Sequence, residues 1–196
     1  KALFSNALKE KPVVIKDISI LGVTNCKEAM QEEHSIISVF LTEDKKVIKQ
    51  RLIDRGEKKE RIKNRLALYN KEQAARFKFD FIIKNSNYNK SIAKLEAIIN
   101  LGKNKDIIYP YKNYTKLSAK KIDKYAFKLE KGKDLKPIQV ALIDNKIYIV
   151  DGMHRYLASL KTGKNVSKQF IECEKQKFEF NLDEWKKIVA SYDIKK

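Results

Sequence analysis

Five consecutive residues, Asp151-Gly152-Met153-His154-Arg155, combine the residue types that bind and activate a phosphate group. They follow an apolar segment of strand length and precede a helical pattern. A glycine at such a junction lets the backbone turn sharply and approach an anion. The amino end of the following helix offers unpaired N–H groups and the positive end of a dipole. We therefore predict a phosphate-binding strand–turn–helix at residues 137–164.

We predict phosphate-binding and catalytic residues within this segment and directly before it. The predicted phosphate contacts are Gly152, Met153, His154, Arg155 and Lys136. The predicted catalytic residues are Asp151, as the nearest carboxylate that could accept a proton from a hydroxyl group, and His154. A structural hydrogen bond is the alternative interpretation of His154 taken alone.

The arginines of this lysine-rich chain are clustered. Of its six arginines, five lie between residues 51 and 76 and the sixth is Arg155. The planar guanidinium group matches the geometry of phosphate better than the lysine ammonium does. Arginines such as Arg55 and Arg65 could therefore stabilise the charge of a phosphoryl group. A pair of solvated helices with charged faces is the simpler alternative.

Composition limits the classes of protein to which the chain could belong. The 196 residues carry a net charge of +18, which favours a nucleotide or nucleic acid as partner, although a genome rich in A and T would also enrich lysine. With 43% hydrophobic residues, a packed core is expected and disorder is not. No apolar run approaches the ~18 residues that span a bilayer, so no membrane partner is expected. The two cysteines are far apart and form no metal-binding pattern, so we predict no metal site and a cytoplasmic location.

The hydrophobic periodicity predicts an alternation of helices and strands in the first half and a change of pattern near residues 102–105. In the first half, Thr42 is expected to cap a helix that ends at Gly56. The expected elements there are a helix at 2–9, a buried strand at 12–15, a helix at 24–33, a strand at 35–41, helices at 42–56 and 59–76, a strand at 79–83 and a helix at 89–101. Strands and helices that alternate in this way favour a parallel α/β sheet.

The second half is expected to mix helices with a hairpin. Ser118 lies where it could cap a helix, and Asp144-Asn145 is a tight-turn signal. The expected elements are a helix at 117–129, strands at 138–143 and 146–150, a helix at 155–160 that Gly163 stops, a strand within 166–180, and a closing helix at 183–192 anchored by Trp185. We therefore predict two domains, residues 1–102 and 106–196.

The stretch from residue 12 to residue 101 resembles the C-terminal half of guanylate-kinase-like P-loop proteins. The likeness rests on five segments: Val13-Val14-Ile15-Lys16-Asp17, residues 36–41, Arg51-Leu52-Ile53-Asp54-Arg55-Gly56, Arg61-Ile62-Lys63-Asn64-Arg65-Leu66, and Phe79-Asp80-Phe81-Ile82-Ile83-Lys84-Asn85. The resemblance implies an α/β fold with a parallel sheet, a lid carrying Arg51, Arg55 and Arg65, and Asp17 on the acceptor side. The chain contains no G-x-x-x-x-G-K-[ST] loop, so the resemblance does not extend to the phosphate loop of that family.

Residues 107–180 resemble the ParB/sulfiredoxin-like superfamily, an α+β fold, through Pro137-Ile138-Gln139-Val140, a hairpin, and Gly152-Met153-His154-Arg155. Met153 stands where sulfiredoxins carry their catalytic cysteine, so sulfinic acid reduction is not expected. About 30 residues follow Lys164, too few for the DNA-binding domain of ParB proteins. The turn is most similar to that of small-molecule kinases in this superfamily.

The sequence therefore predicts a nucleotide-phosphate-binding protein, with an ATP-dependent phosphotransferase as the specific form, acting through Asp151 to Arg155. The resemblance implies ATP or another nucleoside phosphate with Mg²⁺ as cofactor. Two alternatives stay open. One is a ParB-like module that binds DNA or RNA without catalysis, and the other is a scaffold in which neither half retains chemistry.

Overall fold

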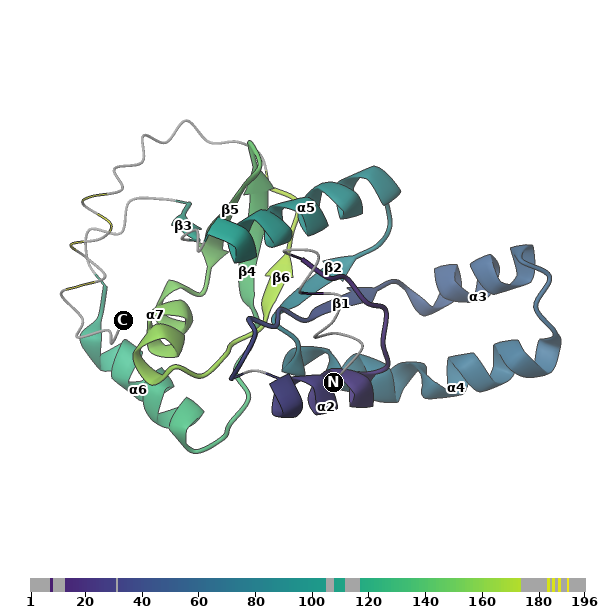
Figure 1. Cartoon of the computed structure of the whole chain (residues 1–196), viewed down its shortest axis with the longest axis horizontal. Helices are drawn as coiled ribbons and strands as arrows, with labels where there is room; N and C mark the ends of the chain where they lie inside the picture. Colours follow the sequence, from purple (N-terminus) through teal and green to yellow (C-terminus); the bar gives the residue numbers. More distant parts are fainter. Residues whose placement is uncertain are drawn as a thin grey trace.

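The computed structural model describes residues 8, 13–30, 32–104, 108–111 and 117–173, together with 183, 185, 187 and 190. The strands of both halves lie in one sheet of six strands, in the order β1-β2-β6-β4-β5-β3 (Figure 1). The strands are β1 (Val39–Thr42), β2 (Phe81–Lys84), β3 (Tyr109–Pro110), β4 (Ile138–Ile143), β5 (Lys146–Asp151) and β6 (Lys168–Phe170). The sheet is thus of the predicted α/β kind, and the division at residues 102–106 stays a prediction.

Strand direction changes once across the sheet. β1, β2, β6 and β4 are parallel neighbours, whereas β5 is antiparallel to β4 and β3 is parallel to β5. The β4–β5 hairpin turns at Asp144 and Asn145, whose φ angles are +47° and +60°. Both are residue types that tolerate this left-handed conformation in two-residue hairpin turns, so the predicted tight turn is confirmed.

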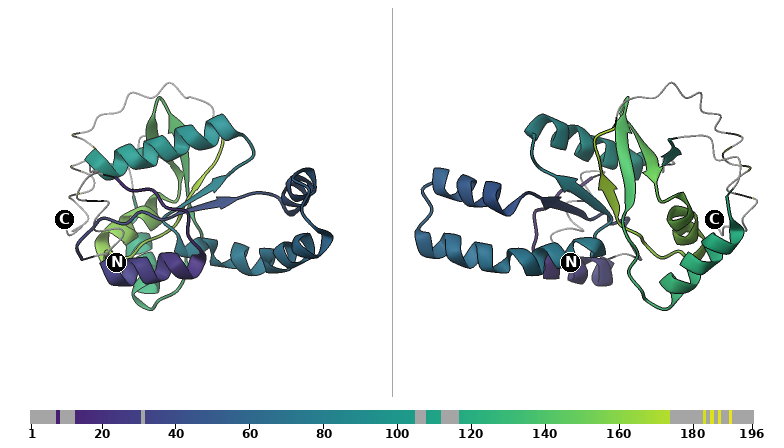
Figure 2. Two further views of the ribbon diagram at one scale, coloured as in Figure 1. Left: turned by 45° about the vertical axis from the view of Figure 1, so that its right-hand side comes forward. Right: turned by 180° about the vertical axis from the view of Figure 1, so that it is seen from behind.

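Two pairs of helices lie at opposite ends of the molecule. α3 and α4 extend away from the sheet as a pair, joined by residues 55–58, whereas α6 and α7 lie side by side at the opposite end (Figures 1 and 2). The described helices are α2 (Ile20–Met30), α3 (Lys45–Asp54), α4 (Lys59–Ala75), α5 (Tyr88–Asn104), α6 (Ala119–Glu130) and α7 (Met153–Thr162), with a 3₁₀ turn, η1, at Arg76–Lys78.

Several predicted helix boundaries are confirmed by the backbone. Ser118 caps α6, because its side-chain oxygen accepts a hydrogen bond from the Lys121 N–H. Gly56 and Gly163 follow α3 and α7 in left-handed conformations, with φ angles of +71° and +66°. Glycine is the residue that adopts this geometry most readily at a helix end.

Two local predictions are wrong. Residues 13–15 form no strand, and the Ile15 side chain is 76% exposed because no neighbouring strand pairs with this segment. Thr42 ends β1 instead of capping a helix, and Asp44 occupies the N-cap position of α3. Several predicted segments lie outside the described residues: the helix at 2–9 apart from residue 8, residue 12, the part of the strand at 174–180, and most of the closing helix.

The hydrophobic core joins the two halves of the chain. It includes Phe81, Ile83 and Ile98 from the first half and Val140 and Leu157 from the second. The rings of Phe81 and Phe170 stack with their centroids 6.0 Å apart across β2 and β6. Trp185, 2% exposed, belongs to the same core. Residues of both halves are therefore packed in one core, which includes residues of α6 and α7 but, among the described residues, none of α3 or α4.

Candidate functional site

The predicted phosphate-binding turn forms at the junction of β5 and α7. Asp151 ends β5, and Gly152 adopts a left-handed conformation with a φ angle of +94° at the start of α7. The side chain of Arg155 folds back over Gly152, so closely that a Cβ on Gly152 would lie 2.6 Å from Arg155 Nη2. Only glycine leaves room for this arrangement.

The Arg155 guanidinium is held by groups of this chain. Its Nη2 donates to the Asp151 carboxylate at 2.8 Å and to the Pro137 carbonyl oxygen at 3.2 Å. Its Nε is buried and has no hydrogen-bond partner among the described residues. Part of the donor capacity of Arg155 is therefore already used to join the turn to the start of β4.

His154 connects the amino ends of two helices. Its Nε2 accepts a hydrogen bond from the backbone N–H of Ser118, at 3.2 Å, immediately before α6. Burial lowers the pKa of His154, and the positive charges of Lys121 and Arg155 lower the pKa further. The neutral imidazole is favoured, with Nε2 already occupied as an acceptor. A role for Nε2 as a catalytic base requires this bond to open.

The two remaining residues of the predicted turn site differ in exposure. Met153 is 2% exposed and packs in the core, so its side chain is not available to a ligand at the turn. Lys136 is exposed and directly precedes Pro137, whose carbonyl oxygen accepts from Arg155. The structure therefore gathers Asp151, Gly152, His154 and Arg155 at one junction, with Lys136 at its border.

The predicted lid corresponds to α3, α4 and the residues between them. Arg51 is anchored at the ends of β1 and β2, because its Nη2 donates to the Asn85 carbonyl oxygen at 3.0 Å and lies 3.5 Å from Glu43 Oε2. Arg55 and Arg65 are exposed, and neither guanidinium group has a hydrogen-bond or ion-pair partner within the described ranges. Two arginines of the lid are thus available to a ligand, and the third is fixed at its base.

The base of the lid contains two charged residues that the sequence analysis missed. Glu43 is 6% exposed at the end of β1, and its Oε2 has no hydrogen-bond partner among the described residues. Lys84 ends β2 and lies 3.8 Å from Glu43 Oε1; a hydrogen bond to Asp44 raises its pKa. The acidic pair Glu43-Asp44 directly after an apolar strand is the signal that could have found Glu43, because ligands of parallel sheets bind at the carboxyl ends of the strands. By the same rule, Lys84 could have been found as the charged residue that ends the next apolar strand.

Further hydrogen bonds attach the lid to the sheet. The Tyr69 hydroxyl on α4 donates to the Glu43 carbonyl oxygen at 3.0 Å, and the Thr42 hydroxyl donates to Gln73 Oε1 at 3.0 Å. Both bonds join the end of β1 to the second half of α4. The tips of α3 and α4 have no such attachment among the described contacts.

The turn and the lid lie at opposite ends of the parallel strands. The register aligns Val39, Phe81, Lys168 and Ile138 at the amino ends of these strands, where the neighbouring Gln139 pairs with Asp151. The lid instead follows Thr42 and Lys84, at the other ends of these strands. Asp17, the predicted acceptor-side residue, is exposed in a segment without regular structure.

The described residues contain no group of three or more His, Cys, Asp or Glu side chains placed to hold a metal ion. Within the same ranges, no helix is both long enough and apolar enough to cross a membrane.

A protein-family model described as guanylate kinase matches residues 4–101, which is half of the chain. The chain belongs to the guanylate kinase family. The match includes β1, the lid helices α3 and α4, β2 and most of α5, so the predicted guanylate-kinase-like character of this half is confirmed. Comparisons with curated proteins and with solved structures found no match. The ParB/sulfiredoxin likeness of the second half is therefore a prediction that rests on its own residues.

Proposed function

We propose that this guanylate kinase family chain binds a nucleoside phosphate, such as ATP with Mg²⁺, through the arginines of its lid. The observation that carries the proposal is the contrast among Arg51, Arg55 and Arg65. Arg51 is fixed at the carboxyl ends of two parallel strands, while Arg55 and Arg65 are exposed and unpaired within the described ranges. Guanidinium groups in this arrangement can approach a polyphosphate from a pair of helices that extends from the sheet and stabilise its charge.

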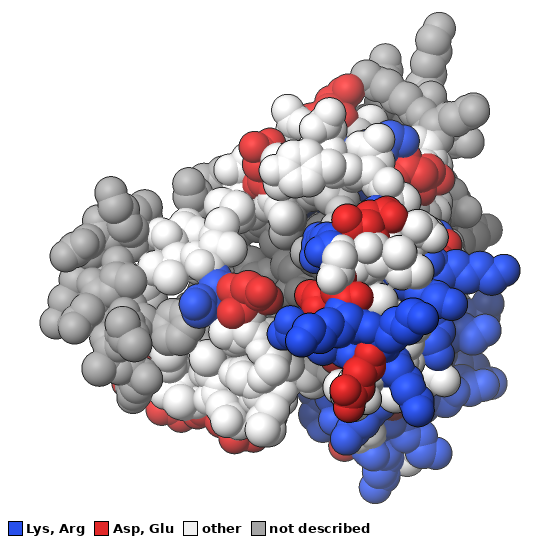
Figure 3. Space-filling model, turned by 90° about the vertical axis from the view of Figure 1, so that its right-hand side faces the viewer, with Lys and Arg blue, Asp and Glu red and all other residues white. Residues whose placement is uncertain are grey.

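The surface charge of the lid supports this proposal. Between residues 45 and 75 the chain has eleven lysines and arginines against four carboxylates. Figure 3, which faces this end of the molecule, shows a broad basic surface there. Such a field attracts anionic ligands and raises their association rate.

Phosphoryl transfer is the finer form of the proposal. A bound Mg²⁺ is held largely by nucleotide phosphates and water, with one or two carboxylates, so it does not need a dedicated protein cluster. The sequence contains no G-x-x-x-x-G-K-[ST] loop to hold the β- and γ-phosphates. We therefore assign phosphate binding to the lid. Whether the protein also transfers a phosphoryl group is tested separately, by an assay of ATP consumption.

A second candidate phosphate site is the turn at residues 151–155. The observation that favours it is the Arg155 guanidinium, whose buried Nε is unpaired among the described residues beside the amino end of α7. In that case Arg155 would exchange Asp151 for a phosphate oxygen, and Asp151 would be released to act on an acceptor hydroxyl.

Thermal unfolding with ATP, ADP, CTP and GTP, each with Mg²⁺, tests both sites. A ligand at 100 times its Kd should stabilise the protein by about 2.7 kcal/mol. Lid binding predicts that Arg55→Ala and Arg65→Ala remove most of this stabilisation. Arg61→Ala is the matched control, since Arg61 is exposed on α4 but already pairs with Glu57 at 3.2 Å.

The outcomes separate the candidates. Loss of the nucleotide effect in Arg155→Ala and His154→Ala, with Arg55→Ala unchanged, would transfer the function to the turn. No stabilisation by any nucleotide would refute both sites. Salt-sensitive binding of duplex DNA or RNA without a nucleotide effect would favour the non-catalytic nucleic-acid module instead.

A further inference from the structure

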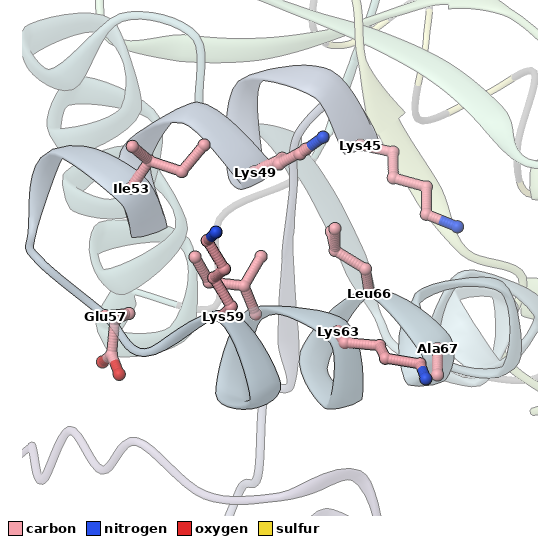
Figure 4. Close-up of a pocket in the computed structure, with 9 residues that line it drawn as sticks. Lys45, Lys49, Ile53, Glu57, Lys59, Lys63, Leu66 and Ala67 are labelled. Atoms are coloured by element: carbon pink, nitrogen blue, oxygen red, sulfur yellow. The ribbon is translucent and has the colours of Figure 1, made fainter.

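A groove of about 870 Å³ lies between α3 and α4. Its lining residues are of two kinds, aliphatic and charged, and both helices contribute to it (Figure 4). The aliphatic residues are Ile53, Ile62, Leu66 and Ala67, and the charged residues are Lys45, Lys49, Glu57, Lys59 and Lys63. The groove is separate from Arg55 and Arg65, to which we assign nucleotide binding.

The lysines of the groove form two rows. Lys45 and Lys49 are four residues apart on α3, and Lys59 and Lys63 are four residues apart on α4, so each pair lies one turn apart on one face of its helix. Like charges at this spacing repel each other. Glu57, the carboxylate among the lining residues, lies 3.2 Å from Arg61 and is therefore already paired. The groove has an excess of positive charge along its length.

The two helices bury little of their apolar surface. None of the ten residues of α3 is buried, and on α4 only Ile62 is. Ile53, in the last turn of α3, is 48% exposed. Short helices in proteins are stabilised mainly by packing an apolar face against a neighbour. Aliphatic surface between α3 and α4 is therefore left for a further element to cover.

We propose that this groove binds an acidic amphipathic helix of a partner protein. A helix can lay an apolar ridge, with residues at i, i+3, i+4 and i+7, into a groove between two other helices. Asp and Glu residues beside that ridge would face the two lysine rows, much as charged residues flank the seam of a coiled coil. One partner would then cover the aliphatic residues of the groove and also pair with its lysines.

Other anionic ligands match fewer of these features. Among the described residues, no aromatic, amide or hydroxyl side chain lines the groove, and such groups fix the orientation of a bound small molecule. A nucleic-acid duplex would contact the lysines but would place its charged backbone against the aliphatic residues. Complementarity in both charge and polarity therefore favours the acidic helix.

Fluorescence anisotropy with a labelled peptide tests the proposal. The probe has about eleven residues, or three helical turns, with leucines at i, i+3, i+4 and i+7 and glutamates at the other positions. Saturable binding is expected, weakened at least about fivefold by Lys49→Glu and by Lys63→Glu. Lys46→Glu and Lys71→Glu are controls on the same helices outside the groove, and they should change the Kd less than about twofold.

A second pair of variants tests the aliphatic part of the groove. Ile53→Gln should weaken peptide binding at least about fivefold, because it removes an apolar contact. Leu68→Gln is the matched control, since Leu68 is 49% exposed on α4 and does not line the groove. Circular dichroism confirms that all variants stay folded.

Three results would overturn the proposal. The first is no binding of the leucine–glutamate peptide. The second is equal binding of a peptide with the same composition but scattered leucines, or equal losses in the control variants. The third is displacement of the peptide by ATP or a duplex oligonucleotide with the same dependence on Lys49 and Lys63, which would make the groove a general anion site.

Discussion

Replacement of Gly152 by alanine should destabilise the protein more than any comparable glycine replacement. A non-glycine residue in a left-handed conformation costs about 1–2 kcal/mol, and the φ angle of Gly152 is +94°. The new Cβ would also lie 2.6 Å from Arg155 Nη2 and 3.0 Å from Arg155 Cζ and Nε. The guanidinium must therefore move and lose its bonds to Asp151 and Pro137.

The displacement of Arg155 adds to the backbone cost. Because the Asp151 side chain is 65% exposed, its ion pair contributes at most about 1 kcal/mol. The bond to the Pro137 carbonyl oxygen contributes about 1 kcal/mol more. The total loss for Gly152→Ala is about 2–4 kcal/mol, which is a large share of the stability of a typical domain.

Gly163→Ala provides the matched control. Gly163 has a φ angle of +66°, but among the described residues no heavy atom beyond its chain neighbours lies within 4 Å of the position of its added Cβ. It should therefore lose only the backbone term, about 1–2 kcal/mol. Urea denaturation followed by circular dichroism measures the stability of both variants. With a slope of about 2 kcal/mol per molar, the urea midpoint should fall by about 1–2 M for Gly152→Ala and by about 0.5–1 M for Gly163→Ala.

The double variant Gly152→Ala/Arg155→Ala isolates the clash. With the guanidinium gone, Gly152→Ala should cost only its backbone term, so the two substitutions should be less than additive by about 1–2 kcal/mol. Equal losses for Gly152→Ala and Gly163→Ala, or strict additivity in the double variant, would refute the structural role assigned to Arg155.

The remaining predictions concern the contacts of α6, α7 and the lid. The pKa of His154 is lowered in the folded protein, so the unfolded chain binds the proton more readily. The free energy of unfolding should therefore have its full value above about pH 6.5 and decrease as the pH falls below it. His154→Gln, which keeps an acceptor for the Ser118 N–H, should remove this component of the urea midpoint between pH 7.5 and 5.5. Ser118→Ala should lower stability by about 1 kcal/mol through loss of the α6 cap, and Ser118→Asp should restore it. Tyr69→Phe should lose about 1 kcal/mol by leaving the Glu43 carbonyl oxygen without this donor, measured by the same denaturation.

Local signals in the sequence account for most of the confirmed structure. Asp144-Asn145, Ser118 and the glycines after α3 and α7 each specify a backbone geometry within a few residues. The hairpin strand at 138–143 and the long helix at 59–75 follow directly from such signals and from their periodicity. These predictions succeed because neighbouring residues alone determine the conformation.

The failed strand at 13–15, and the long-range contacts that the sequence did not indicate, depend on distant partners. Residues 13–15 have a strand-like composition but pair with no neighbouring strand, and composition alone gives no sign of that. β6 is only three residues long, yet it joins β2 to β4 and thereby unites the two halves in one sheet. The bonds from Arg155 to Pro137 and from His154 to the Ser118 backbone also cross long stretches of sequence. No local pattern encodes such pairings.

The single sheet holds the turn and the lid apart. β5 runs opposite to β4, so Asp151 lies near the starts of the parallel strands, whereas the lid follows their ends. The core between the two ends of the strands is shared by both halves of the chain. Its close packing prevents the turn and the lid from approaching each other within one molecule. One phosphate group therefore cannot contact Arg155 and Arg65 of the same molecule. If variants of both residues reduce nucleotide binding, two nucleotide sites or two copies of the chain are required, and the number of nucleotides bound per chain distinguishes these cases.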